Sequence, residues 1–540
     1  MDFASTLMLI AVGIAWLTWW FIIPLYQSPL WSLRGPPAPS WFNGHFKQIS
    51  TVRNSLQMQE WVAAYGPSFL VRWFGMMPCL WTIDPVTIAH ILSHAYDYEK
   101  PLEGRLQVAR LIAKSILVSE GELHRKMRKI MNPAFGTAQI RRLHEVFVDK
   151  AADLRELWKG EILDQGGRGH MNIVDGLGRA TLEVIGVAGF NYQLGSLSSA
   201  EETNELNHAF RATFKNPPKF SFIRVIMEMF PLLDFFPSER TKNLREAKRV
   251  TDRIGAQLLE ERKAMIRSEV LKDTQAIQSQ DVAGRDLLTL LVKSNMAMNI
   301  PENQRLSDEE VLAQIPTFLI AGHETSSTAL AWCLYAISQA PEVQEKLRRE
   351  LLAMGTDVTP SLDELAALPY LDAVVRETLR VYGPLTTTLR AASRDDVLPI
   401  SKPFKDSSGK IRTEIRIAKG NRIIIPLMAM NQSQALWGND AFEFKPERWE
   451  KASTGTEGVP GVWGNSSSFG YGPRACIGFR FAVDEMKVFL YTLVRAFEFE
   501  PATSPGDVAR TGTVVQRPSL LSQPDKGTQL PLFVKEHVIA

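Results

Sequence analysis

The chain has 540 residues, and its 61 basic and 59 acidic side chains leave a formal net charge of +2. This balance argues against nucleic acid as the main partner. A hydrophobic content of 45% is typical of a folded globular protein and excludes disorder over most of the chain. The three cysteines, Cys79, Cys333 and Cys476, are too few and too scattered for a disulfide framework, which indicates a reducing compartment.

The apolar composition of residues 1–26 predicts a transmembrane anchor. The segment from Phe3 to Tyr26 has no charged side chain. As a helix at about 1.5 Å per residue it would span roughly 36 Å, which exceeds the bilayer core of about 30 Å. A cleaved signal peptide is the alternative, but the segment lacks a basic start and its apolar run is long for one. Asp2 precedes the segment and Arg34 follows it, so the positive-inside rule predicts a cytosolic body.

Residues 27–40 contain the run Arg34-Gly-Pro-Pro-Ala-Pro39, which predicts an extended hinge or a featureless linker. The remainder, residues 41–540, shows no internal repeat and predicts one large domain that is mainly helical with small sheets. Apolar spacing predicts helices at about 138–159, 241–268, 307–340, 342–353 and 370–381. Strands are expected at 69–74, 79–83, 414–417 and 422–426.

The helix expected from residue 307 has unusual features in its interior. Ser307 and Glu310 form a capping box at its start. Pro316 removes one backbone hydrogen bond and should kink the helix. Farther on stands the sequence Ala321-Gly-His-Glu-Thr-Ser326, in which Gly322 costs about 1 kcal/mol relative to alanine. Such a glycine calls for a packing or functional reason, and room for a small ligand is one.

The segment Phe469-Gly-Tyr-Gly-Pro-Arg-Ala-Cys-Ile-Gly478 is the most informative part of the chain. Its glycines permit tight turns and a close approach of the backbone to a flat ligand. Arg474 can form charge-assisted hydrogen bonds to a carboxylate. A helix should start after Gly478, which would place Cys476 near partial positive charge that favours a thiolate. With average residue usage, the spaced pattern of Phe469, Gly472, Arg474, Cys476 and Gly478 would arise by chance in roughly one chain of this length in ten thousand.

These residues resemble the cytochrome P-450 family, whose haem-ligand signature is Phe-x-x-Gly-x-Arg-x-Cys-x-Gly. Three further segments match the family in the same order, and the resemblance covers essentially the whole chain, most like fungal microsomal members. These segments are Ala321–Ser326, Glu377-Thr-Leu-Arg380 and Pro446-Glu-Arg-Trp449.

The resemblance implies that Cys476 is the axial ligand of the iron of haem b. A thiolate ligand donates electron density to the haem iron and favours scission of the O–O bond. By family position, further residues would bind the cofactor, either as part of the ligand loop or through the haem propionates. These residues are Phe469, Gly470, Gly478, Arg474, Arg128, Arg390 and His124. His124 departs from the family pattern, which usually has tryptophan there, although histidine can still donate a hydrogen bond.

By resemblance, Thr325 and Glu324 are the alcohol and the acid that relay protons during oxygen activation. The alternative for Thr325 is a hydroxyl that bonds back to its own helical turn, which is common for such residues. Glu377 and Arg380 would form, with Arg448, a buried structural cluster rather than a catalytic one. An ordinary surface salt bridge is the alternative for any Glu-x-x-Arg pair.

The implied activity is a monooxygenase reaction that uses O2 and electrons from an NADPH-cytochrome reductase on the endoplasmic reticulum membrane. A basic patch would suit an acidic flavoprotein of this kind. The substrate would be a lipophilic small molecule, with a terpenoid or other secondary metabolite as the guess that the family suggests. Two rival hypotheses stay open: an oxygen-independent haem-thiolate isomerase or lyase, and a haem-binding sensor without turnover. The patch would comprise Arg125, Lys126, Lys129, Arg480 and Lys487.

Overall fold

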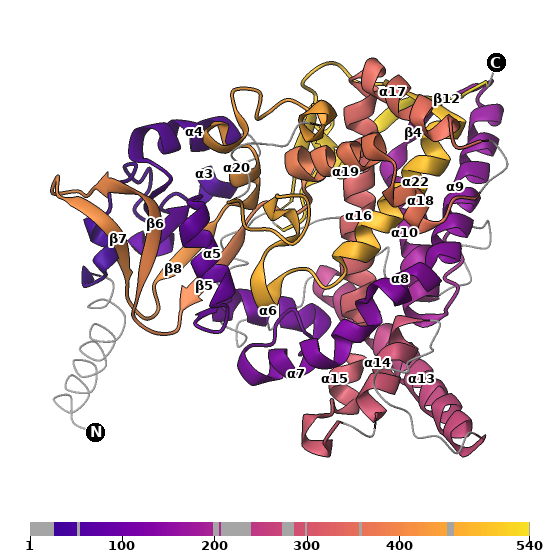
Figure 1. Cartoon of the computed structure of the whole chain (residues 1–540), viewed down its shortest axis with the longest axis horizontal. Coiled ribbons are helices and arrows are strands. Elements are labelled where there is room, and N and C mark those ends of the chain that lie inside the picture. Colours follow the sequence, from indigo (N-terminus) through magenta and orange to yellow (C-terminus); the bar gives the residue numbers. More distant parts are fainter. Residues whose placement is uncertain are drawn as a thin grey trace. The chain divides into compact units, whose positions relative to one another are not determined.

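The computed structural model describes most of the chain beyond the N-terminal segment (Figure 1). The described residues are 26–50, 54–197, 205–206, 239–272, 286–297, 300–355, 359–450, 458–512 and 514–538. Within these ranges no helix combines the length and the apolar character that crossing a bilayer requires. The anchor expected at residues 1–26 lies outside the described residues except for Tyr26.

The chain divides into two compact units, and the expectation of a mainly helical fold with small sheets is confirmed. Unit 1 comprises Met1–Pro101, Thr386–Ala441 and Gly455–Ala475. Unit 2 comprises Leu102–Leu385, Phe442–Thr454 and Cys476–Ala540. The Phe469–Gly478 segment therefore begins in unit 1 and ends in unit 2.

Unit 1 is built on a five-stranded sheet in the order β1-β2-β8-β5-β3. The strand β2 is buried along its whole length, and Phe69 of β1 stacks on Trp81 of β2 with the ring centroids 4.5 Å apart. The helix α5 follows β2 directly because Asp84 caps it and Pro85 occupies its first turn. The bounds are β1 Ser68–Arg72, β2 Pro78–Thr82, α5 Pro85–Ser93, β3 Tyr98–Glu99, β5 Thr388–Ala392 and β8 Arg422–Ile425.

The remaining elements of unit 1 include four α-helices, one of them α21 Gln434–Trp437, and a separate antiparallel hairpin, β6-β7. Part of the expected hinge also belongs to this unit. Leu30 and Leu33 are buried in its core, and the Leu70 amide donates to the Arg34 carbonyl at 2.9 Å. Residues 29–34 are therefore packed against the sheet instead of forming a free spacer. The bounds are α3 Phe46–Ser50, α4 Asn54–Tyr65, β6 Asp396–Lys405, β7 Ile411–Ile417 and α20 Leu427–Asn431.

Unit 2 is organised around the helix α16, Gln314–Ser338, which packs against α10, α19 and α22 (Figure 1). The C-terminal half of α16 is apolar on nearly all sides and is buried, as expected for a central helix. The elements that position the site are α7 Gly121–Met131, α10 Ile173–Phe190, α19 Pro369–Tyr382, α22 Phe479–Ala496, β10 Val508–Thr511 and β11 Arg517–Leu520. Strands β10 and β11 form an antiparallel pair of their own.

The other elements of unit 2 are mostly helices, with one three-stranded sheet in the order β4-β12-β9. The helices are α6 Leu102–Ile112, α8 Thr137–Arg142, α9 His144–Asp164, α13 Glu239–Lys272, α14 Leu287–Met296, α15 Asp308–Leu312, α17 Pro341–Leu352 and α18 Leu362–Ala366. The strands are β4 Arg168–Asn172, β9 Phe497–Pro501 and β12 Pro531–Glu536.

The helix expected from residue 307 begins as predicted but is broken once. The capping box of Ser307 and Glu310 is present, and α15 ends at Leu312 before α16 starts at Gln314. The break precedes Pro316 because the proline lacks the N–H that would bond to the Leu312 carbonyl, and its ring clashes with that carbonyl. The break in the helix therefore lies about one turn before the proline, at which we expected the kink.

Candidate active site

Cys476 stands at the start of α22, as the sequence predicts. Gly478 is the N-cap of this helix and no side chain caps it there, so the helix begins immediately after the cysteine loop. Cys476 as a residue is exposed to solvent, yet desolvation of its thiol raises the pKa of Cys476. A hydrogen bond from the Gly478 backbone and the charge of Arg128 act in the opposite direction. These two groups offset part of the rise that desolvation causes, because a hydrogen bond and a positive charge both stabilise the thiolate form.

Arg128 and His124 lie on α7, four residues apart on one face of the helix. His124 is buried, so the residue that replaces the usual tryptophan sits in the interior of unit 2. Unit 2 thus brings Arg128 within electrostatic range of the Cys476 thiol.

The first half of the cysteine loop lies in unit 1 and is shaped by two glycines. Gly470 has φ 69° and Gly472 has φ 71°, both in the left-handed region that favours glycine. A Cβ on Gly472 would also come within 2.2 Å of the Leu92 carbonyl oxygen of α5. Next to this turn, the Arg474 guanidinium lies over the Tyr96 ring, 5.6 Å from its centroid.

A short turn, Ser467–Phe469, precedes these glycines and is held by α20. The Asn431 side chain accepts a hydrogen bond from the Ser467 amide at 3.0 Å. Phe469 packs edge-on against Trp463, with their centroids 6.1 Å apart. Contacts inside unit 1 therefore fix the backbone that leads to the cysteine.

Arg390, on β5 of unit 1, is a buried cation without a carboxylate partner among the described residues. Its Nη1 donates to the Thr388 hydroxyl at 2.6 Å and to the Leu389 carbonyl at 2.7 Å. Its Nε is buried without a hydrogen-bond acceptor, and burial lowers the pKa of Arg390 to about 10. A buried guanidinium in this condition is expected to pair with an anionic group, because leaving it unpaired is costly.

The middle of α16 is open to solvent although the helix is otherwise buried. Ala321 is exposed and Thr325 is partly exposed. The Thr325 hydroxyl donates to the Ala321 carbonyl at 2.6 Å. This is a hydrogen bond back to its own helical turn, which was the alternative to a relay. A Cβ on Gly322 would meet the Ile185 Cδ1 atom of α10 at 2.8 Å. Close packing of α10 on α16 therefore explains this glycine.

Glu324 is buried and forms an ion pair with Arg517 of β11. Arg517 could not be predicted from the sequence as a partner of Glu324, because the two residues are 193 positions apart and no local pattern connects them. The charge of Arg517 also reaches the neighbouring His323. Burial first and Arg517 second lower the pKa of His323 to about 4, so this imidazole is neutral near pH 7.

Glu377 is fully buried in unit 2, together with Arg380, and is the centre of a cluster of hydrogen bonds. Arg380 donates to both of its carboxylate oxygens, at 2.9 and 2.8 Å, and Arg448 donates at 2.8 Å. The Trp449 indole and the Lys445 amide complete the set at 3.0 and 2.9 Å. The expected buried cluster is therefore confirmed, and the alternative interpretation of Glu377 and Arg380 as a surface salt bridge is wrong. The cluster joins α19 to the turn Pro446–Trp449.

Comparison with known proteins indicates the same family as these motifs do. The family model for cytochrome P-450 matches residues 34–523. The chain belongs to the cytochrome P-450 family. It is 46% identical over 537 residues to cytochrome P-450 monooxygenase 205 of Postia placenta, with 98% of each chain covered. It is also 33% identical over 524 residues to the ganoderic acid synthetase of Ganoderma lucidum, with 93% of this chain and 94% of that protein covered.

Membership of the cytochrome P-450 family makes the protein an oxidoreductase of the monooxygenase type, and it implies a haem-thiolate cofactor. The residues fit that group. Cys476 is the one exposed cysteine, whereas Cys79 and Cys333 are buried. The unsatisfied guanidinium of Arg390 is suited to a propionate.

The basic patch expected for a reductase is only partly present. Lys487 is buried and donates to Asp372 of α19 at 2.7 Å, so its inclusion in the patch was wrong. The reason is that Lys487 lies on the face of α22 that packs against α19. Lys126 forms an ion pair with Glu310 at 3.1 Å. Arg480 remains exposed, with its guanidinium over the Phe479 ring.

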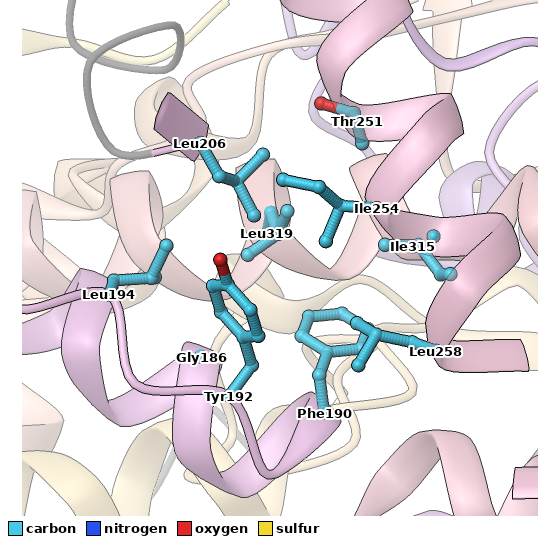
Figure 2. Close-up of a pocket in the computed structure, with 11 residues that line it drawn as sticks. Gly186, Phe190, Tyr192, Leu194, Leu206, Thr251, Ile254, Leu258, Ile315 and Leu319 are labelled. Atoms are coloured by element: carbon cyan, nitrogen blue, oxygen red, sulfur yellow. The ribbon is translucent and has the colours of Figure 1, made fainter. Parts of the chain in front are cut away.

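An apolar cavity lies between α10, α13 and α16 (Figure 2). In Figure 2 the Phe190 and Tyr192 side chains from the end of α10 and the loop after it face Leu319 and Ile254. Ile315 and Leu319 line it from α16. At 3.6 residues per turn, Ala321 and Thr325 lie roughly 120° around the helix from that pair. This cavity is therefore separate from the exposed face of α16.

Proposed function

We propose that this monooxygenase binds haem b through Cys476 and oxidises a lipophilic small molecule. The observation that carries the proposal is the placement of Cys476. Cys476 is exposed at an uncapped helix start, and the Gly478 backbone and Arg128 offset part of the rise in pKa that desolvation of its thiol causes. When bound, the haem would supply the activation of dioxygen. Oxygen-independent rearrangement and a sensor role have no observation of their own in their favour.

In this proposal Arg390, Arg474, Arg128 and His124 hold the propionates. The buried guanidinium of Arg390 supports its own role, since an anion would satisfy the Nε that the described residues leave without an acceptor. The turns at Phe469, Gly470 and Gly478 allow the backbone to approach a flat ring.

Thr325 and Glu324 would supply protons on the exposed face of α16. The Thr325 hydroxyl donates its proton to the Ala321 carbonyl, so its oxygen stays available to accept another. Rotation of the hydroxyl would then pass a proton on, with Glu324 one residue away as the acid that restores it. The partial exposure of Thr325 in an otherwise buried helix supports this role.

The electron donor would be an NADPH-cytochrome reductase, and residues 1–26 would anchor the protein in the endoplasmic reticulum membrane. The uncharged segment from Phe3 to Tyr26 supports the anchor. A terpenoid or other secondary metabolite is the substrate class to screen first. The Ganoderma relative is named for ganoderic acid, which makes that compound class a reasonable start.

The test is a carbon-monoxide difference spectrum of the reduced full-length protein. The wild type should show the Soret position of thiolate ligation, and Cys476→Ala should lose it. Cys333→Ala removes the other thiol of unit 2 and should keep the spectrum. Loss of the signal in both variants, or in neither, would contradict the assignment of Cys476.

The relay is tested separately by Thr325→Val. The variant should keep the haem spectrum but release more hydrogen peroxide per NADPH consumed. Thr317→Val is a matched control, because the Thr317 hydroxyl makes the same kind of bond on α16, to Ala313 at 3.0 Å, at a buried position. Equal peroxide release from both variants would argue against a specific role for Thr325.

A further inference from the structure

The ion pair between Glu324 and Arg517 joins the centre of α16 to a strand near the C-terminus. Both side chains are largely buried, with 11% of the Glu324 side chain and 17% of the Arg517 side chain exposed. A carboxylate removed from water needs a partner to stay charged, and a guanidinium next to it favours the ionised form. Arg517 is the cation that meets this need.

The strand that carries Arg517 is held in place by independent contacts to unit 2. The Trp332 indole of α16 donates to the Gln516 carbonyl at 2.9 Å. The Gln516 amide in turn donates to the Pro384 carbonyl at 2.9 Å. The residue directly before Arg517 is thus fixed on both of its backbone polar groups.

The partner strand β10 is anchored by a partly buried arginine. The Arg510 guanidinium lies 4.9 Å from the centroid of the Tyr382 ring and 5.6 Å from that of Trp332. It also donates to the Val381 carbonyl at 3.0 Å. Cation–π contacts of this kind are strongest where they are desolvated. The β10-β11 pair is therefore attached to α16 and α19 whether or not Arg517 contacts Glu324.

From this geometry we propose that Arg517 is a positioning residue for Glu324. It holds the carboxylate in one orientation beside Thr325 and keeps it ionised, so that Glu324 can accept a proton from solvent. The proposal rests on the relay role of Glu324 proposed above. The anchored β10-β11 pair acts as the rigid support that brings the guanidinium to the helix.

The first measurement requires no turnover. A double-mutant cycle with Glu324→Gln and Arg517→Gln compares the thermal unfolding midpoints of the haem-loaded proteins. The double variant should lose clearly less than the sum of the two single losses, because either substitution already breaks the pair. Additive losses would overturn the ion pair as a stabilising contact.

The second measurement is hydrogen peroxide released per NADPH consumed. Arg517→Gln should raise this ratio about tenfold, as Glu324→Gln should, and the double variant should be no worse than either. Arg517→Lys keeps the positive charge and should restore most of the coupling. Arg262→Gln is the matched control, because it breaks a similarly buried pair with Asp286 elsewhere in unit 2.

The outcomes distinguish the relay role of Glu324 from the positioning role of Arg517. If Glu324→Gln uncouples the reaction and Arg517→Gln does not, the positioning role is refuted and the relay stands. If Glu324→Gln leaves coupling unchanged, the relay itself is refuted, and the role of Arg517 falls with it. If Arg262→Gln uncouples as strongly as Arg517→Gln, general destabilisation explains the result and the proposal is overturned. Should Arg517→Gln fail to fold, Arg517→Met, which removes the charge but keeps an unbranched side chain, takes its place in both measurements, with the same expected and overturning results.

Discussion

Replacement of Glu377 by glutamine tests how much the buried cluster contributes to stability. The Glu377 carboxylate accepts two hydrogen bonds from Arg380 and one each from Arg448, Trp449 and the Lys445 amide. Neither Glu377 nor Arg380 has exposed side-chain surface. Glutamine keeps the shape but removes the negative charge that faces the two guanidinium groups of Arg380 and Arg448. Removing one partner of a buried ion pair costs about 3–5 kcal/mol.

At roughly 2 °C of midpoint per kcal/mol for a large domain, Glu377→Gln should lower the unfolding temperature by about 6–10 °C. Differential scanning calorimetry of the haem-loaded protein measures this, with haem content as a second readout. Asp153→Asn is the control, since it breaks the surface pair with Lys150 and should shift the midpoint by about 1 °C at most. A Glu377→Gln midpoint no lower than that of the control would refute the reasoning.

Two further predictions concern helix packing and pH. Gly255→Ala should stabilise the protein by up to about 1 kcal/mol in chemical denaturation, since alanine favours α13. The new Cβ meets the flexible Ile315 Cδ1 at 3.0 Å in the lining of the apolar cavity, and a loss of stability would show that Ile315 cannot move. Burial raises the pKa of Glu485 from 4.5 to about 8, although Ser326 offsets part of this. The folded protein then retains a proton that the unfolded chain releases, so stability falls by up to about 1.4 kcal/mol per unit as the pH rises from about 4.5 to about 8. As the pH rises over that range, the unfolding temperature of Glu485→Gln should therefore increase relative to that of the wild type. A difference between the two unfolding temperatures that does not change with pH would contradict this.

Local patterns in the sequence predicted the elements that local chemistry determines. The capping box at Ser307 and the helix start after Gly478 both appear where expected. The Glu377–Arg380 pair was predictable because both residues share one face of one helix. Strands β1, β2 and β8 also lie within a residue or two of the ranges that alternation and turn residues indicate.

Long-range packing explains what the sequence did not predict. The helix α10 was missed because its four glycines lower helix propensity, and tertiary packing outweighs that cost. A Cβ on Gly176 would come within 2.4 Å of the Trp158 Nε1 atom of α9, so the glycine is required by the neighbouring helix. Lys487 appeared to be a surface charge because its partner, Asp372, lies 115 residues away.

The packing around Gly322 changes how the exposed face of α16 should be understood. The sequence suggested that this glycine makes room for a small ligand, but its missing Cβ faces Ile185 of α10. The adjacent turn is held by the same helix, because the Thr181 hydroxyl of α10 donates to the His323 carbonyl at 3.2 Å. On another side of α16, Arg517 binds Glu324. The turn that carries Thr325 is therefore fixed by α10 and β11 together, so its geometry depends on residues outside the family motif.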